Sequence, residues 1–211
     1  MEKYPLTQTQ LGIYFDWLKF PDSTIYNIPC LYRLGAQVDM EKLKSALKKV
    51  VEAHPYLSVS FEKAENGDIV AVKNRTASVI IPIKNEEPQM EELVRPFDLL
   101  SKEPLYRCCL FDHENGKYLF LDTHHIISDG ASISILLEDI NHAYDGKEVA
   151  GETYTGFDRA VDEEKMRRLI KKQVDASQPA FLMMLAMQIP EYNKHKDDKP
   201  KPLVKQGKIT A

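Results

Sequence analysis

The chain has 211 residues, of which 43% are hydrophobic and 28% are charged, and its net charge is −4. This length is enough for one good-sized domain core, and the composition is ordinary for a globular protein. The small negative charge gives no electrostatic reason to expect nucleic acid or an anionic membrane as a partner.

The first predicted elements are a helix and a strand. Thr7 is positioned as an N-cap, and apolar residues then recur at the i, i+3, i+4, i+7 spacing of one helix face, which predicts an amphipathic helix over 8–19. A strand is predicted over 27–34. Pro29 has no N–H to donate, so it favours the edge of a sheet or an irregular start for this strand.

A second helix is predicted after Asp39, which serves as its N-cap. The dipeptide His54-Pro55 ends this helix, because the residue before a proline is disfavoured in the helical conformation. The stripe that it should bury comprises Leu43, Ala46, Leu47, Val50 and Val51.

Two Asn-Gly dipeptides, at 66–67 and 115–116, each separate a pair of strand-like segments and therefore predict two hairpins. Between the hairpins the sequence favours a short strand over 79–83 and a short helix over 88–94. The paired segments are 57–62 with 68–73, and 105–112 with 117–124.

The last predicted helix of the lobe covers 131–144, with Gly146 as its C-terminal stop. The order of helices and strands indicates an α/β or α+β fold with one mixed sheet covered by helices. We expect a compact lobe over 1–150, a helical extension over 151–190 and a polar linker or tail over 191–211.

The cysteines and the N-terminus bear on the cellular compartment. Cys30, Cys108 and Cys109 are odd in number and two are adjacent, so we expect reduced thiols, as in the cytoplasm. The N-terminus has no apolar signal region, and the longest apolar block, 180–189, is too short to cross a bilayer. The sequence therefore predicts a cytoplasmic protein that does not enter a membrane.

The strongest functional signal is the string HHIISDG, from His124 to Gly130, between a predicted strand and a predicted helix. Because neighbouring side chains on a strand diverge, one of His124 and His125 should face a cavity and the other should pack inside. A histidine can take a proton from an amine, alcohol or thiol near neutral pH. Asp129 can hold a local turn or meet a cation, and Gly130 permits a sharp bend or a close backbone approach.

Each of these residues also has a simpler interpretation. A histidine at a strand end is more often structural than catalytic. A metal site is disfavoured, because adjacent histidines diverge and make poor ligands together with Asp129. Ser128 or Ser132 as a nucleophile lacks a G-x-S-x-G turn. The other histidines are isolated in the sequence and are most simply surface or packing residues: His54, His113, His142 and His195.

Three separated segments resemble the condensation domains of nonribosomal peptide synthetases, which belong to the chloramphenicol acetyltransferase-like superfamily. Segment 5–14, PLTQTQLGIY, is similar to the opening PLTxxQ motif of that family. Segment 51–61, VEAHPYLSVSF, is similar to RHPxLRTxF, and 124–130 is similar to HHxxxDG. The segments follow one another in the family's order and cover about residues 4–150.

The resemblance implies a chloramphenicol acetyltransferase-like lobe and a specific chemistry. His125 would be the catalytic residue, acting as general base or positioning group while an amine attacks a donor thioester to form an amide. His124, Asp129 and Gly130 would be the structural members of the motif. No cofactor or metal would be bound directly, since both substrates would arrive on phosphopantetheine arms of carrier (thiolation) domains.

The chain departs from the family pattern in two ways. Ser58 replaces the arginine that the family's LRTxF string offers to the motif aspartate. We expect Asp129 to be buried or half-buried and bound either to an arginine, with Arg33 and Arg107 as candidates, or to backbone N–H groups. Condensation domains have two similar lobes with the substrate tunnel between them, and the motifs here are those of the N-terminal lobe. The missing C-terminal lobe or a neighbouring subunit would then be a required partner.

The sequence leaves three functions open. The first is the N-terminal half of an amide-forming condensation enzyme, inactive in isolation. The second is a stand-alone oligomeric acetyltransferase-like enzyme with its sites between subunits. The third is a non-catalytic module that binds a carrier or a synthetase, which the replacement of the arginine by Ser58 favours.

Overall fold

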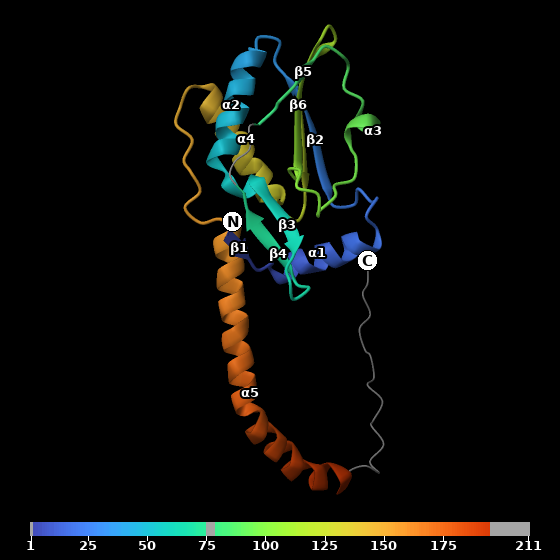
Figure 1. Ribbon diagram of the computed structural model, residues 1–211, viewed down its shortest axis with the longest axis vertical. Helices are drawn as coiled ribbons and strands as arrows, with labels where there is room; N and C mark the ends of the chain where they lie inside the picture. The colour runs from blue at the N-terminus through green and yellow to red at the C-terminus, as the bar shows by residue number, and fades with distance from the viewer. Residues whose placement is uncertain (1, 75–78, 195–211) are drawn as a thin grey trace, which may run out of the picture. The chain divides into compact units, whose positions relative to one another are not determined.

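The computed structural model describes residues 2–74 and 79–194 of the chain. The chain forms two units, Met1–Glu164 and Lys165–Ala211. The first unit contains the described strands and the helices that precede the last one, and we call it the lobe (Figure 1). Among the described residues, no helix combines the length and the hydropathy of a membrane span.

The first two predicted helices are confirmed, and their caps explain where they begin. α1 (Gln8–Lys19) starts after Thr7, whose hydroxyl accepts the backbone N–H of Gln10 at 3.2 Å. α2 (Met40–Ala53) starts after Asp39, whose carboxylate accepts a backbone N–H of the first turn. These side chains satisfy N–H groups that have no partner within the helix, so they specify the helix starts.

A mixed four-stranded sheet forms the centre of the lobe. In spatial order its strands are β2 (Asn27–Leu34), β7 (Gly116–His124), β6 (Tyr106–His113) and β5 (Ile83–Lys84). β5 runs parallel to β6, and the other pairs are antiparallel. β2 lies at one edge of the sheet, as the proline at position 29 predicts, because an edge strand can lack an N–H without breaking the sheet.

A smaller antiparallel sheet is separate from the central one, although the sequence predicts a single mixed sheet. In spatial order it contains β1 (Glu2–Tyr4), β4 (Ile69–Lys73) and β3 (Val59–Lys63). β3 and β4 form the hairpin predicted at Asn66-Gly67, where Gly67 has a φ of 86° that favours glycine. The strand start predicted at residue 57 is wrong, because Pro55–Ser58 form a short 3₁₀ helix, η1.

The segment between the two hairpins is less regular than predicted. Of the strand expected over 79–83, only Ile83 lies in a strand, β5, and Pro82 before it has no N–H to give to the ladder with β6. The carbonyl of Pro82 still accepts the N–H of Leu110 at 3.0 Å. The helix expected over 88–94 is a single turn, α3 (Met90–Leu93).

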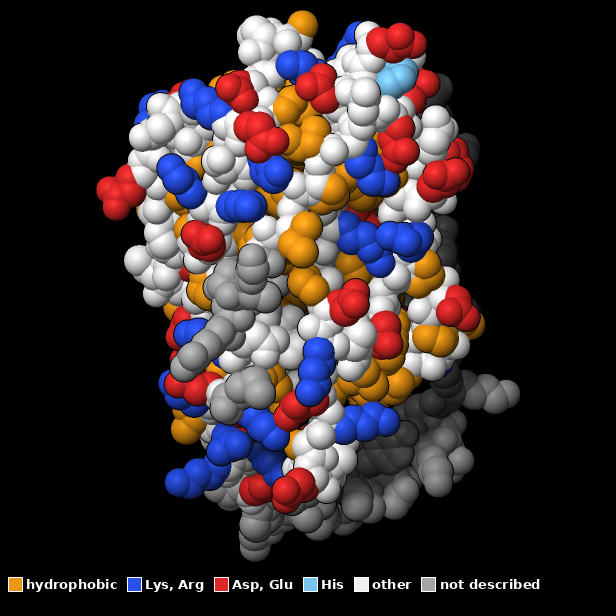
Figure 2. All heavy atoms as spheres, turned by 45° about the horizontal axis from the view of Figure 1, so that its top comes forward, with side chains coloured by type: hydrophobic (Ala, Val, Ile, Leu, Met, Phe, Trp, Pro, Cys, Tyr) orange, Lys and Arg blue, Asp and Glu red, His pale blue; other side chains and the backbone are white. Residues whose placement is uncertain are grey.

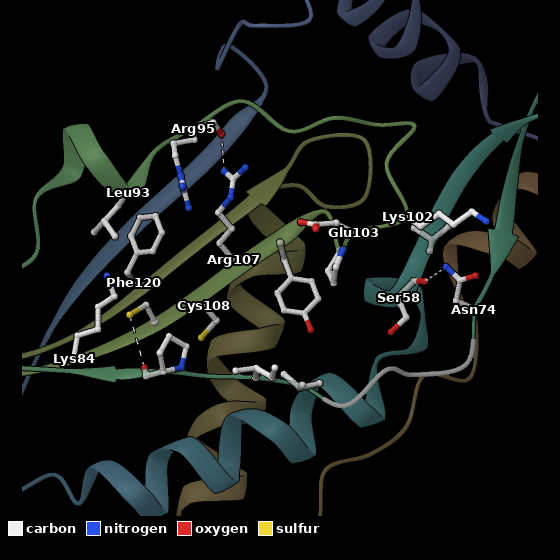
Figure 3. Close-up of a pocket in the computed structure, with 17 residues that line it drawn as sticks. Ser58, Asn74, Lys84, Leu93, Arg95, Lys102, Glu103, Arg107, Cys108 and Phe120 are labelled. Atoms are coloured by element: carbon white, nitrogen blue, oxygen red, sulfur yellow. Dashed lines mark hydrogen bonds between the residues drawn. The ribbon is translucent and has the colours of Figure 1, made fainter.

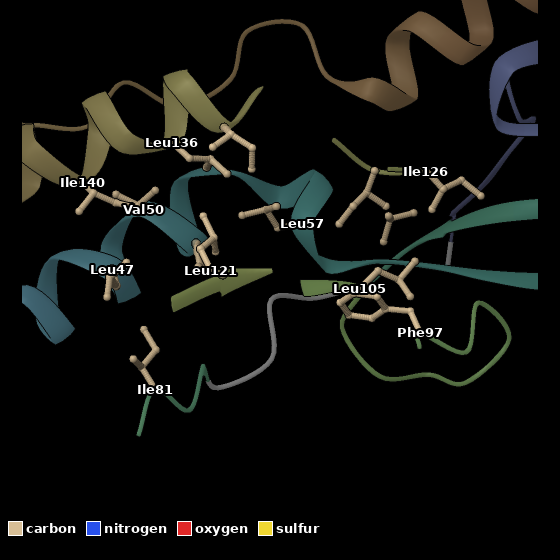
Figure 4. Packing of buried hydrophobic residues seen from close by; sticks show 14 of the residues in the cluster. Leu47, Val50, Leu57, Ile81, Phe97, Leu105, Leu121, Ile126, Leu136 and Ile140 are labelled. Atoms are coloured by element: carbon tan, nitrogen blue, oxygen red, sulfur yellow. The ribbon is translucent and has the colours of Figure 1, made fainter. Parts of the chain in front are cut away.

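Two helices cover one face of the central sheet (Figure 1). α4 (Gly130–Tyr144), which confirms the third predicted helix, packs against α2. Their buried side chains meet those of β7 in the main core, where Val50 is 2% exposed (Figure 4). Since side chains alternate along a strand, the opposite face carries its own cluster, built on Cys109, Phe111 and Phe120.

α5 (Gly156–Lys194) begins within the lobe. Phe157 in its first turn is 2% exposed, and its ring packs edge-on against Tyr56 with centroids 4.7 Å apart. Residues 195–211, which hold most of the expected polar tail together with His195, lie outside the described residues. The expected domain boundaries stay predictions.

Candidate active site at the end of strand β7

The HHIISDG string joins β7 to α4, as the change of periodicity predicts. β7 ends at His124, a turn covers residues 125–127, and α4 begins at Gly130. His125 therefore lies in the turn between a strand of the central sheet and a helix that packs on that sheet. Both flanking elements are anchored in the core, so the turn is held at its two ends.

His124 points into the lobe. The residue is 3% exposed, and its ring meets Phe97 edge-on with centroids 5.8 Å apart. Its Nδ1 accepts the backbone N–H of Ile126 at 3.1 Å. Burial, followed by the neighbouring His125, lowers the pKa of His124 to about 4. The ring is therefore neutral with its proton on Nε2, which suits a side chain that packs and orders the turn.

His125 faces outward and borders a cavity. The residue is exposed, and it lines a hollow of about 540 Å³ whose walls also come from α1, η1, α4 and the start of α5. Its backbone N–H donates to the carbonyl of Tyr26 at 2.8 Å. The predicted division between an inward and a cavity-facing histidine is confirmed. The catalytic role of His125 stays a prediction.

Asp129 caps α4 and has no arginine partner among the described residues. Its Oδ1 accepts the backbone N–H of Ser132 at 2.9 Å and the Ser132 hydroxyl at 2.7 Å, and these bonds hold the pKa of Asp129 below its usual range. The expected burial is wrong, because Asp129 is exposed, and neither Arg33 nor Arg107 pairs with it. The other expected arrangement, a bond from a backbone N–H, is confirmed. An exposed N-cap needs no cation, so Ser58 leaves no buried charge unpaired at this position.

The remaining residues of the string make local contacts. The Ser128 hydroxyl is buried and pairs with that of Thr123 at 2.6 Å, while the Ser132 hydroxyl is bound to the helix cap. The Ser132 hydroxyl donates to the Asp129 carboxylate as part of that cap, and neither hydroxyl has a histidine as its hydrogen-bond partner among the described residues. A Cβ at Gly130 would meet no heavy atom of the described chain within 4 Å. No described part of the lobe therefore approaches the Gly130 backbone closely enough to require a glycine.

A buried ion pair lies directly before the string, and no sequence pattern singled it out. Asp122 on β7 is 0% exposed, and its Oδ2 accepts from Arg107 at 3.0 Å and from Asn27 at 2.8 Å. Arg107 also donates to the carbonyls of Arg95 at 2.6 Å and Pro96 at 2.7 Å. Burial raises the pKa of Asp122, and the bonds from Asn27 and Arg107 oppose that rise. The sequence offered one signal for this ion pair, namely the carboxylate of Asp122 within a largely apolar strand.

His54 is not isolated, contrary to the sequence-based expectation. It is 5% exposed, its Nδ1 lies 2.7 Å from a carboxylate oxygen of Glu152, and its Nε2 lies 2.7 Å from one of Asp139. The hydrogen bond with Glu152 is the largest cause that raises the pKa of His54, although burial opposes it. Both ring nitrogens face carboxylates, so the geometry fits the imidazolium form, which donates from both. The cluster joins α2, α4 and the segment before α5 beside the cavity.

A second hollow, of about 730 Å³, contains none of the residues of the string. Figure 3 shows Arg95 and Arg107 on one side of it, with Leu93, Phe120 and Cys108 nearby. Burial raises the pKa of the Cys108 thiol to about 12, so this thiol is not a nucleophile at neutral pH. The candidate site is therefore the smaller hollow, which presents an accessible imidazole.

Two further features of the described residues concern metal ligands and surface charge. Within residues 2–74 and 79–194, no group of three or more His, Cys, Asp or Glu side chains is placed to hold a metal ion. On the face shown in Figure 2, basic and acidic side chains interleave around hydrophobic ones. Such interleaving differs from the single-sign surface with which proteins bind nucleic acid.

Comparison with known sequences identifies relatives. The family model described as "Condensation domain" matches residues 1–179. Tyrocidine synthase 2 of Brevibacillus parabrevis is 34% identical over 151 residues, which is 69% of this chain and 4% of that protein. Surfactin synthase subunit 1 of Bacillus subtilis (strain 168) is 30% identical over 151 residues, again 69% of this chain and 4% of that protein. The chain thus spans less than a tenth of these relatives.

Solved structures share the fold. The starter condensation domain of rhizomide synthetase RzmA aligns with a TM-score of 0.67 and 18% identity, over 87% of this chain and 48% of that one. The first condensation domain of the calcium-dependent antibiotic synthetase, solved with a substrate analogue, aligns with a TM-score of 0.65 and 22% identity, over 80% of this chain and 44% of that one. The described lobe therefore has the fold found in slightly less than half of each solved domain.

Proposed function

Because this chain belongs to the condensation-domain family of nonribosomal peptide synthetases, we propose that it is the N-terminal lobe of an amide-forming acyltransferase. The intact enzyme joins an acyl or aminoacyl thioester, carried on the phosphopantetheine arm of a carrier domain, to an amine acceptor. One observation carries the proposal: His124 is buried and neutral, while His125 borders a cavity at the same strand end.

His125 acts on the acceptor amine in this proposal. Its imidazole takes the proton as the amine nitrogen attacks the thioester carbonyl carbon. The new C–N bond forms, the C–S bond breaks, and the leaving thiolate takes the proton from the imidazolium of His125, which restores the free base. The N-terminus of α4, at Gly130, lies next to this turn, and its partial positive charge favours the negative charge that develops on the carbonyl oxygen.

The proposal requires partners beyond these residues. The opposite wall of the substrate tunnel would come from the C-terminal lobe or from a neighbouring subunit, and two carrier domains would deliver the substrates. Since no disulfide joins Cys30, Cys108 and Cys109 in the structure, their free thiols are compatible with the reducing cytoplasm in which we expect the enzyme to work.

Reconstitution tests the proposal. We expect the isolated chain to form no amide from loaded carriers, because loss of positioning alone can remove about 7–11 kcal/mol of rate acceleration. Supplying the C-terminal lobe, in cis or in trans, should restore turnover, and His125→Ala should abolish it without changing the melting temperature. His142→Ala, at the other end of α4, is the matched control and should keep full turnover.

Two outcomes would favour the alternatives. Product formation by the isolated chain at the rate of the two-lobed protein would support an oligomeric acetyltransferase-like enzyme, and sedimentation would detect the oligomer. Carrier binding without product, even with both lobes present, would support a non-catalytic module. Ser58, where the family has an arginine, is the observation that favours this last alternative.

A further inference from the structure

The side chain of Gln10 links three parts of the His125 cavity. Gln10 lies in the first turn of α1 and is 8% exposed. Its Oε1 accepts the backbone N–H of Thr7 at 3.0 Å and the Thr7 hydroxyl at 3.2 Å. Its Nε2 donates to the carbonyl of Ile126 at 2.9 Å and to the hydroxyl of Tyr56 at 2.6 Å. A backbone N–H only donates and a carbonyl only accepts, so these partners determine the orientation of the amide.

The bond to Ile126 completes the set that fixes the backbone around His125. The N–H of His125 donates to the carbonyl of Tyr26 at 2.8 Å, and the N–H of Ile126 donates to Nδ1 of His124 at 3.1 Å. These two bonds orient the peptide planes on either side of His125. The side chain of Gln10 bonds the carbonyl of Ile126, which belongs to the following peptide plane. A residue of α1 therefore fixes the end of the turn that contains His125.

Tyr56 lines the same cavity, and its ring is held in place by close packing. Burial raises the pKa of Tyr56, so its phenol is neutral and can accept the second N–H of Gln10. Phe157 packs on the ring, and a Cβ at Gly156 would overlap that ring. The amide of Gln10 thus connects the tightly packed Tyr56 side chain to the turn that carries His125.

We propose that Gln10 is a positioning residue that sets where His125 stands relative to the Tyr56 wall; the inference rests on the proposed acyl transfer. The two oxygen lone-pair positions and two N–H groups of the amide are all used within the lobe, so Gln10 acts on the reaction through the turn and not through the substrate. A misplacement of about 1 Å can cost about 100-fold in rate. Gln10→Ala should therefore lower kcat about 100-fold and change KM less than about twofold.

The first experiment needs no activity and uses the full chain. Backbone amide exchange is measured by NMR for the wild type, Gln10→Ala, Thr7→Val and Tyr56→Phe. In Gln10→Ala the amides of His125 and Ile127 should exchange at least tenfold faster, while that of Leu121 within β7 keeps its wild-type rate. Thr7→Val loses the capping hydroxyl but keeps both Nε2 bonds, and Tyr56→Phe keeps the bond to the turn, so neither should change exchange at the turn.

The second experiment measures condensation in the two-lobed protein with the same variants. A fall in kcat for Gln10→Ala at unchanged KM, with the control His142→Ala at the wild-type kcat, supports the positioning role. Wild-type exchange at the turn in Gln10→Ala, or the same acceleration in Thr7→Val, overturns it. If exchange changes as expected but the wild type itself gives no product, the positioning of the turn stands and the proposed acyl transfer fails.

Discussion

Replacing His54 by alanine should destabilise the lobe in a pH-dependent manner. The ring is 5% exposed and lies 2.7 Å from both Asp139 and Glu152, so its removal leaves two carboxylates facing each other. Breaking a buried ion pair costs about 3–5 kcal/mol. The carboxylate side chains are 16% and 24% exposed and keep access to water, so the low end applies. A loss of about 3 kcal/mol corresponds to a melting temperature lower by about 6–12 °C in a chain of this size.

The direction of the pH dependence follows from the pKa of His54, which is raised in the folded lobe above its usual value near 6.5. A raised folded pKa means that the folded state binds the proton more tightly than the unfolded chain. The stabilisation is therefore fully present below about pH 6.5 and is lost as the pH rises through the folded pKa. The difference in unfolding free energy between wild type and His54→Ala should shrink over that range.

Scanning calorimetry between pH 5.5 and pH 9 measures this difference, and subtracting the variant from the wild type cancels the other titrating groups. His142→Ala, near the C-terminal end of the same α4 that carries Asp139, serves as the control and should follow the wild type at each pH. A difference for His54→Ala that is constant with pH, or that grows as the pH rises, would refute an imidazolium held between the two carboxylates.

Three further substitutions test other parts of the lobe. Asp129→Ala should lower the unfolding free energy in urea by only about 1 kcal/mol, as for the loss of an N-cap; a loss above about 3 kcal/mol would reveal a buried charge partner. Arg107→Met should cost about 3–5 kcal/mol because it leaves the buried Asp122 carboxylate without its cationic partner, and adding Asp122→Leu should recover most of that loss. Gly156→Ala should cost about 1–3 kcal/mol, since its Cβ overlaps the Tyr56 ring, and a wild-type melting temperature would show that α5 can shift.

Local signals in the sequence predict much of this fold. α1 and α2 begin where Thr7 and Asp39 predict, because a cap hydrogen bond joins residues only three apart. β2 covers the predicted residues 27–34, with its proline at the edge of the sheet. The strand predicted over 79–83 does not form before Ile83, because β propensity alone is not enough without a pairing partner, and Pro82 has no N–H to donate to β6.

The candidate site could be predicted only where a single segment holds it. Side-chain alternation correctly separates His124 from His125, since both lie on one strand end. His54 and Glu152 are 98 residues apart, and no periodicity in the sequence connects them. For Asp129 the sequence left an arginine or backbone N–H groups as possible partners, and in the structure the carboxylate accepts a backbone N–H at the start of α4.

The single tryptophan makes the assembly of the site observable during refolding. Trp17 on α1 donates its indole N–H to the carbonyl of Phe97 at 3.0 Å, and Phe97 packs against His124. The hairpin of β6 and β7 closes between sequence neighbours, and such hairpins form in about 1–10 μs. Docking of α1 joins Gln10 to Ile126, 116 residues away, so its loop-closure entropy delays it. The fluorescence of Trp17 should therefore report when α1 docks and the end of β7 becomes part of the His125 cavity.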